Sequence, residues 1–173
     1  MKRALCLLLF VASTAALAQE KNPVTSAVKE ILPRQQKNLV AAVEEMPAEK
    51  FDFRPTEKQM TFGHLVLHIL ESNNYQCSKI GDLPEVKAAV PLKESDGKDK
   101  LVPALKASFE FCATALDKVD DSKLGDEVEL YGGKGTRAFA LIALTNAWAD
   151  HYSSAAMYLR LNGLLPPTAQ PKK

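Results

Sequence analysis

Four stretches of this chain repeat apolar residues at steps of three and four, and this repeat constrains the fold more than any other feature. Such spacing places the apolar side chains on one face of an α-helix, which is then buried against neighbouring helices. Proline and glycine separate the stretches, and no strand-type alternation of any length occurs. The sequence therefore predicts an all-α fold, a four-helix bundle with antiparallel or crossover connections. The predicted helices span residues 25–46, 61–80, 99–119 and 136–162.

Breaker residues predict interruptions within and between these helices. Pro33 falls inside the first helix, where it removes one backbone donor and should kink or split the helix. Residues 120–135 form a charged, glycine-rich loop, in which residues 132–135 predict a flexible turn and residues 128–131 a short extended piece. Gly163 follows the last helix as a natural C-terminal cap.

The beginning of the chain has the pattern of a secretory signal peptide. A basic start is followed by an almost wholly apolar run over residues 4–17, and small residues Ala16 and Ala18 precede a polar sequence. The apolar run is shorter than the ~20 residues that span a bilayer, and no second long apolar segment follows. We therefore expect cleavage after Ala18 and one bundle domain over residues 19–173. This domain would have no membrane span and would be periplasmic or secreted.

The charge balance limits the classes of binding partner, and the cysteine content bears on whether the chain forms a disulfide. The chain has 22 Lys and Arg against 21 Asp and Glu, a balance that argues against a nucleic-acid-binding protein. Of the three cysteines, Cys6 lies in the predicted leader, so the exported chain would keep Cys77 and Cys112. In an oxidising compartment this pair favours a disulfide, which would close a loop of about 35 residues. Two separate buried thiols are the alternative.

The three histidines are the strongest candidates for chemistry. His64 and His68 are four residues apart and share one face of the second predicted helix. His151 lies on a largely apolar, inward face of the last predicted helix. Two histidines at this spacing and a third from a facing helix could bind Zn, Ni or Fe and leave positions open for water or substrate. The alternative is that His151 is a hydrogen-bonded core residue.

Glu71 is the candidate catalytic residue, because it follows His68 by three residues and shares its face. It could act as a fourth ligand, as an acceptor for a histidine N–H, or as a general base. An ordinary solvated glutamate is the alternative. The chain has no phosphate-binding loop, no serine-hydrolase elbow and no HExxH motif. The histidines and Glu71 therefore carry the functional interpretation.

Several segments together resemble the DinB-like, YfiT-like superfamily of metal-dependent four-helix bundles. The resemblance covers most of the chain after the leader. It is most specific at the end of the last helix, where YLRLNG is followed by two prolines. The chain particularly resembles an exported branch in which the two cysteines pair. The segments that carry the resemblance are residues 53–55, 61–69, 73–78, 108–112 and 151–167.

The resemblance implies a three-histidine metal site, with one ligand from the second helix and two from the fourth in an HxxxH pattern. His68 and His151 would then be ligands, and the remaining position is Ala147, which cannot bind metal. Either His64 supplies the third ligand from the opposite helix, or metal binding is weak or lost. Characterised members of the superfamily include thiol-dependent transferases and isomerases, in which a metal activates a thiol or an electrophile. The resemblance therefore implies this kind of activity.

The sequence supports three functional interpretations. The first is an exported DinB-like protein of unknown specific activity with an incomplete or rearranged three-histidine metal site. The second is a metal-dependent hydrolase or thiol transferase, with Glu71 or a metal-bound water as the base. The third is a non-catalytic bundle that binds a small apolar ligand in the cleft between the helices at 61–80 and 136–162. A homodimer is a further expectation from the resemblance.

Overall fold

The structure, a computed structural model, describes residues 21–86 and 90–171, and most of its regular structure is helical. Four long helices confirm the predicted all-α four-helix bundle, and their bounds lie close to the predicted ones. The predicted leader lies outside the described residues. The helices are α1 (Pro23–Glu45), α2 (Phe62–Ile80), α3 (Lys98–Leu116) and α4 (Arg137–Leu161).

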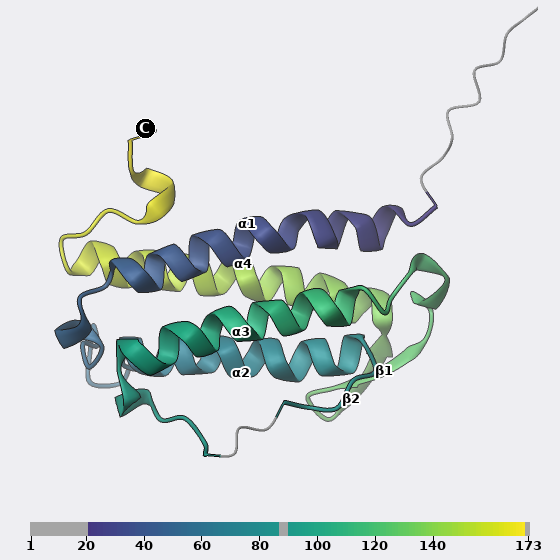
Figure 1. The fold of residues 1–173 in the computed structure, drawn as a ribbon, viewed down its shortest axis with the longest axis horizontal. Coiled ribbons are helices and arrows are strands. Elements are labelled where there is room, and N and C mark those ends of the chain that lie inside the picture. The colour runs from purple at the N-terminus through teal and green to yellow at the C-terminus, as the bar shows by residue number, and fades with distance from the viewer. Residues whose placement is uncertain (1–20, 87–89, 172–173) are drawn as a thin grey trace, which may run out of the picture.

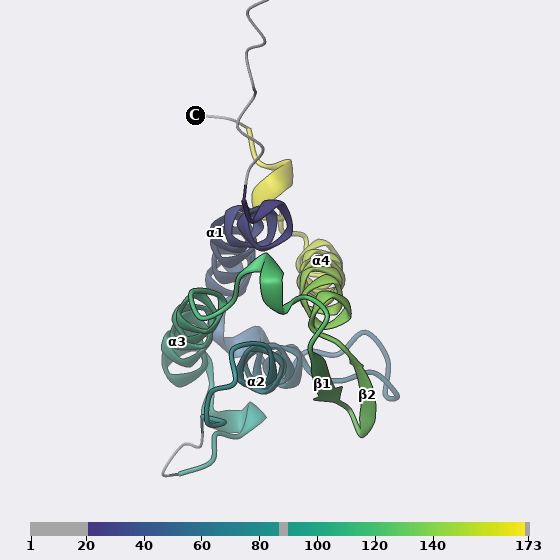
Figure 2. The same ribbon diagram turned by 90° about the vertical axis from the view of Figure 1, so that its right-hand side faces the viewer.

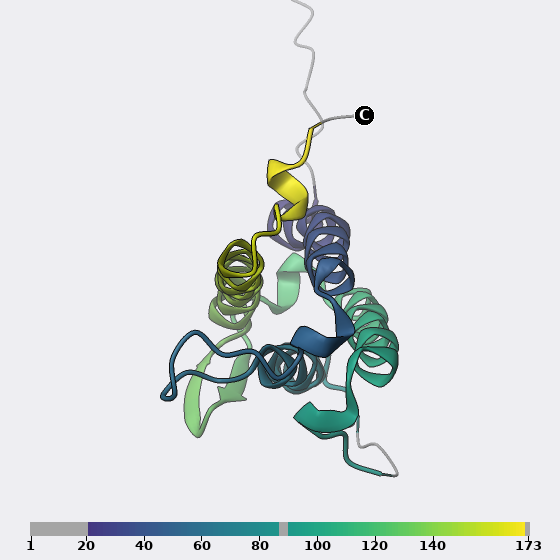
Figure 3. The ribbon, with the colours of Figure 1, turned by 90° about the vertical axis from the view of Figure 1, so that its left-hand side faces the viewer.

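The four helices stand at the corners of a bundle (Figures 1 and 2). α2 packs against α3 and α4, and α1 packs against the same two helices from the opposite corner. Because α2 and α3 run in the same direction, the connection between them has to cover the length of the bundle (Figure 1). Residues 46–61 cross the end of the bundle from α1 to α2 (Figure 3). Of the two connection types predicted, the structure therefore has the crossover type.

Side chains at the helix ends satisfy the backbone groups that the helices leave free. Thr61 and Thr136 cap α2 and α4, and each hydroxyl accepts a backbone N–H three residues on, at 3.0 and 3.2 Å. Asp121, from the segment before the hairpin, accepts two N–H groups in the first turn of α1, both at 2.9 Å. Gly163 takes a positive φ of 75° and ends α4 in a Schellman motif, as predicted for a C-terminal cap.

Pro33 does not split α1, which continues without a break to Glu45. The proline removes only one backbone hydrogen bond. Leu32 and Leu39, on either side of it, are 7% and 0% exposed and belong to the same core. Burial on both sides of the proline therefore keeps the two halves in one helix.

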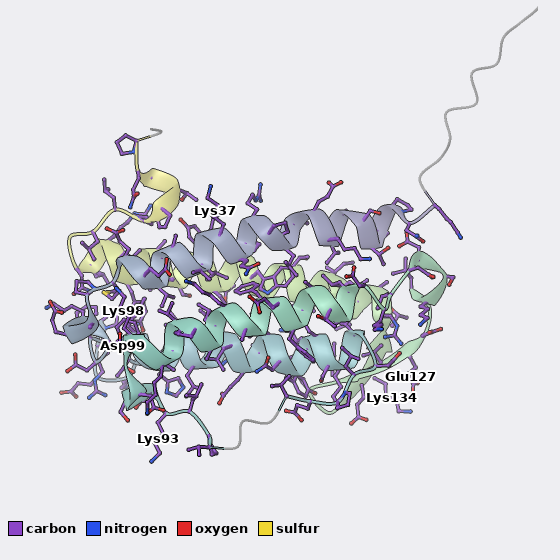
Figure 4. The ribbon with its side chains drawn as sticks, in the orientation of Figure 1. Lys37, Lys93, Lys98, Asp99, Glu127 and Lys134 are labelled. Carbon is purple, nitrogen blue, oxygen red and sulfur yellow. A yellow bond between two sulfur atoms is a disulfide. The ribbon has the colours of Figure 1, made fainter. Side chains whose placement is uncertain are left out.

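The segment before α4 folds into a hairpin of β1 (Glu127–Leu130) and β2 (Gly133–Thr136). The short extended piece predicted there corresponds to β1, but the stretch predicted as a flexible turn is the second strand. The turn is Tyr131–Gly132, whose φ angles of 53° and 74° are those of a two-residue type I′ turn. Lys134 and Glu127 form an ion pair across the hairpin at 2.7 Å (Figure 4). Glycines in β2 hide the alternation by which a strand is recognised.

A buried hydrogen-bond network joins three helices inside the core. Asn73 of α2 accepts from the indole N–H of Trp148 in α4 at 2.8 Å. The same amide donates to the hydroxyl of Ser108 in α3 at 3.0 Å, and Ser108 donates to the carbonyl of Leu105. None of these four residues is more than 2% exposed. Because unpaired polar groups are costly in the core, this network fixes α2 between its two neighbours.

The C-terminal ends of α2 and α3 meet beside a buried arginine. Gly81, directly after α2, approaches Ala115 so closely that a Cβ on it would lie 2.8 Å from the Ala115 backbone. Arg137 is 3% exposed, donates to the carbonyl of Ile80, and pairs with Asp82 at 2.9 Å. The arginine therefore anchors the start of α4 to the end of α2.

Candidate functional site

The structure brings two of the three candidate histidines together. The rings of His68 in α2 and His151 in α4 have their centres 5.1 Å apart and are nearly perpendicular, at 85°. His151 is only 7% exposed, whereas His68 is an exposed residue. The pair therefore consists of one imidazole inside the protein and one in contact with solvent.

Burial controls the protonation of His151. Loss of water around the ring is the main cause that lowers its pKa from 6.5 to about 4. A positive charge on His68 lowers this pKa as well, while Asp150 acts in the opposite direction. The Nδ1 atom of His151 is buried and has no hydrogen-bond partner among the described residues. At neutral pH His151 is thus a neutral imidazole, and its buried Nδ1 finds no partner in the part of the chain that the structure describes.

The third ligand position carries no metal-binding group. Ala147 lies one helical turn before His151 on the same face of α4, and its methyl group cannot bind metal. His64, the candidate replacement, contacts Glu94 instead, with Nδ1 3.0 Å from the carboxylate. The same carboxylate accepts from the hydroxyl of Thr61 at 3.0 Å, and the His64 side chain is 53% exposed. His64 is therefore engaged with the segment before α3 rather than with the histidine pair.

The described residues bring two candidate metal ligands together, but not three. Two histidines bound to one zinc ion, each with Zn–N of ~2.1 Å, have ring centres about 5 Å apart. His68 and His151 match this spacing. Within residues 21–86 and 90–171, however, no group of three or more His, Cys, Asp or Glu side chains is placed to hold a metal ion. Since catalytic zinc sites use three protein ligands, these residues do not fit the complete three-histidine centre.

A pocket of about 480 Å³ lies on the other flank of α2, between α2, α3 and the connection that joins them. The sequence interpretation expected a cleft between α2 and α4, whereas this cavity is between α2 and α3. Glu71 is an exposed residue and lines this pocket. The candidate base therefore borders a cavity that neither His68 nor His151 lines. The lining is mainly apolar and includes Leu67, Leu70, Leu92, Ala104, Ala107 and Phe111.

Cys77 and Cys112 lie at disulfide-bonding distance. Their Cα atoms are 5.1 Å apart, within the range that a disulfide spans, and both side chains are fully buried. This arrangement agrees with the predicted pairing. A bond between the two cysteines would tie α2 to α3.

Asn74 is a lining residue that the sequence analysis missed. Its Oδ1 atom is buried and has no hydrogen-bond partner among the described residues. Its neighbour Asn73 makes the network to Trp148 and Ser108. The signal available in the sequence was the pair itself, because two consecutive asparagines inside an apolar helix are poor helix formers and need partners.

The protein is a four-helix bundle with a crossover connection, and a histidine of α2 faces a histidine of α4 in it. The DinB superfamily matches residues 31–152, and the chain belongs to this superfamily. This confirms the resemblance noted from the sequence segments. A comparison with curated proteins found no match.

Solved structures show the same fold at low sequence identity. A DinB-like protein from Bacillus cereus ATCC 10987 superposes with a TM-score of 0.70 and 15% identity, over 82% of this chain and 95% of that one. A DinB-like protein from Bacillus subtilis gives 0.67 and 18%, over 84% and 99%. A conserved protein from Enterococcus faecalis gives 0.60 and 18%, over 80% and 96%. At such identities the likeness concerns the fold alone.

Proposed function

We propose that this chain is an exported DinB-superfamily bundle that binds a small molecule and holds no resident metal ion. The observation that carries the proposal is the two-histidine site, in which Ala147 occupies the position of the third ligand. Two imidazoles alone bind a divalent ion weakly. A hydrolase or thiol transferase that used Glu71 as its base would need this residue beside the metal, yet Glu71 lines a pocket on the other flank of α2.

Two independent features support export. The first is the signal-peptide pattern of residues 1–18. The second is the placement of Cys77 and Cys112 at disulfide-bonding distance, which is typical of proteins from oxidising compartments. Among the described residues, no helix is long and apolar enough to cross a membrane.

Metal analysis of the chain over residues 19–173 tests the absence of a resident metal. The protein is purified without chelator or a histidine tag, beside the variant Ala147→His. We expect far less than one Zn, Ni or Fe per wild-type chain and about one per Ala147→His chain. Completion of the HxxxH pattern should raise the affinity for Zn by about 100-fold or more.

Two further variants control this experiment. Ala147→Leu enlarges the same position without a nitrogen and should bind no more metal than the wild type. His68→Ala added to Ala147→His should remove the gained metal. Near-stoichiometric metal in the wild-type chain that disappears in His64→Ala would overturn the proposal, because it would establish a rearranged triad and favour the metal-dependent enzyme.

Export is tested separately from metal content. The full-length chain is expressed in a bacterium, and the product in the periplasmic fraction is sequenced from its N-terminus. We expect Gln19 as the first residue. An intact leader on protein that remains in the cytoplasmic fraction would contradict export.

A further inference from the structure

The pocket between α2 and α3 has the size and the walls of a small-molecule site. Its volume of about 480 Å³ is within the range of ligand pockets in proteins. Leu67 and Leu70 line it from α2, Ala104 and Phe111 from α3, and Leu92 from the connection between them. Figure 2 shows the described parts of this connection, residues 81–86 and 90–97, on the outside of α2 and α3. These walls match the hydrocarbon part of a ligand.

Among the described lining residues, the polar side chains are those of Glu71, Asn74 and Ser108. Ser108 donates its one proton to the carbonyl of Leu105 and already accepts from Asn73. The buried Oδ1 of Asn74 has no partner among the described residues, and an unpaired buried acceptor costs about 1–3 kcal/mol. Glu71 adds an exposed carboxylate, and no basic side chain lines the pocket. The pocket therefore favours a ligand that donates hydrogen bonds and carries positive charge.

We propose that the α2/α3 pocket binds a small apolar amine, whose protonated amino group is held by Glu71 and Asn74. The proposal rests on the small-molecule-binding function and names its site and ligand class. Glu71 and Asn74 are three residues apart on α2 and so are neighbours on one helix face. An ammonium group has three donors and the charge opposite to that of the carboxylate. An anionic ligand of the same shape would meet the like charge of Glu71, and none of the described lining residues is basic to offset it.

The test is a fluorescence displacement assay on residues 19–173 with the disulfide intact. N-phenyl-1-naphthylamine is the probe, and octylamine, octanol and octanoate are the competitors. The three competitors share a hydrocarbon chain and differ in the charge of the head group. We expect octylamine to displace the probe at a concentration at least about 10-fold lower than octanoate, with octanol between them.

Substitutions in the pocket locate the binding. Ala107→Trp fills the pocket from an exposed position on α3 and should abolish probe binding, whereas Ala149→Trp on the outside of α4 should not. Glu71→Gln should weaken octylamine by about fivefold and leave octanol unchanged. Glu30→Gln, an exposed charge change on α1, is the matched control. Asn74→Leu should weaken octylamine and octanol together, because both donate.

Three results would overturn the proposal. Absence of probe binding to the folded protein would remove the site. Equal effects of Ala107→Trp and Ala149→Trp would place the probe elsewhere. Octanoate that competes as well as octylamine would contradict the ligand class. Metal content is measured separately, so stoichiometric metal in the wild-type protein would overturn the proposed function without deciding whether the pocket binds amines.

Discussion

The two flanks of α2 divide between them the features that one functional site would combine. On the flank toward α4, His68 faces the buried His151, and titratable groups meet there. On the flank toward α3 lies the pocket, with mainly apolar walls and no histidine. The same helix thus supplies chemistry on one side and space on the other.

This difference shows that side-chain chemistry and cavity space are set independently in a helix bundle. The histidines lie where the sequences of α2 and α4 place them. The space for a ligand remains where a neighbouring helix has small side chains. On α3 these are Ala104 and Ala107, which leave room opposite the leucines of α2. A catalytic interpretation based on histidine spacing therefore needs a separate demonstration of space for a substrate.

The largest expected effect concerns the predicted bond between Cys77 and Cys112 on the pocket flank. Replacement of both Cys77 and Cys112 by alanine should lower the free energy of unfolding by about 3–4 kcal/mol, because the loop between them is 35 residues long. Urea unfolding of the oxidised wild-type and variant proteins measures this. Non-reducing peptide mapping that finds two free thiols in the exported protein would contradict the bond.

Two adjacent asparagines sharpen the comparison. Asn73→Leu should cost about 2–3 kcal/mol of unfolding free energy, because the indole N–H of Trp148 would be left buried without its acceptor. Asn74→Leu should be neutral or stabilising, because it removes an acceptor that has no partner among the described residues. Chemical denaturation of both variants gives the two values. Equal losses would mean that Asn74 has a structural partner and is not held free for a ligand.

Acid should destabilise the protein through the buried histidine of the α4 flank. The pKa of His151 is about 4 in the folded protein, against 6.5 for an ordinary histidine side chain, so the unfolded chain takes up the proton first as the pH falls. The stability that the neutral His151 ring contributes is fully present above pH 6.5 and is lost as the pH falls toward 4. The loss at pH 5 is about 2 kcal/mol relative to neutral pH.

Unfolding of the wild type and of His151→Leu at pH 7 and pH 5 isolates this contribution. The variant should lack this part of the pH dependence, whereas His64→Ala should retain it. An unchanged difference between pH 7 and pH 5 in His151→Leu would assign the acid sensitivity to other groups.

The smallest effect is expected at His64. His64→Ala removes an exposed contact with Glu94, and such pairs contribute less than about 1 kcal/mol. Stability and metal content should both stay close to those of the wild type. A loss of bound metal in this variant would join His64 to the histidine pair and remove the contrast between the flanks.

The fold could be predicted further than the site. Helical periodicity fixed the four helices, and Gly163 marked the end of α4 as the structure has it. Periodicity failed in β2, where two of the four residues are glycines and no apolar residue alternates with the polar ones. Local spacing also could not show that Pro33 would stay within a continuous α1, since burial on both sides of the proline decides this.

Prediction of the site needed the direction of each side chain around α2 and the position of the neighbouring helices. Residue spacing along the sequence gives only the first of these. The spacing of His64 and His68 placed them on one face, but Glu94, distant in sequence, contacts His64. Glu71 was placed beside His68, and the position of α3 makes it a lining residue of a different cavity. Cavities depend on how whole helices pack, so neither the pocket nor the unpaired Oδ1 of Asn74 was predicted.

The parallel course of α2 and α3 has an electrostatic consequence at the end where Gly81 approaches Ala115. Each helix carries a partial negative charge at its C-terminus, so two like poles are brought together in surroundings that screen them poorly. The buried guanidinium of Arg137 lies on the last carbonyls of α2 and supplies the opposing charge. A lysine at position 137 would carry the same charge, but it lacks the planar guanidinium whose second nitrogen also reaches Asp82. The parallel course of α2 and α3 is therefore accompanied by a buried cation at the end where their like poles meet.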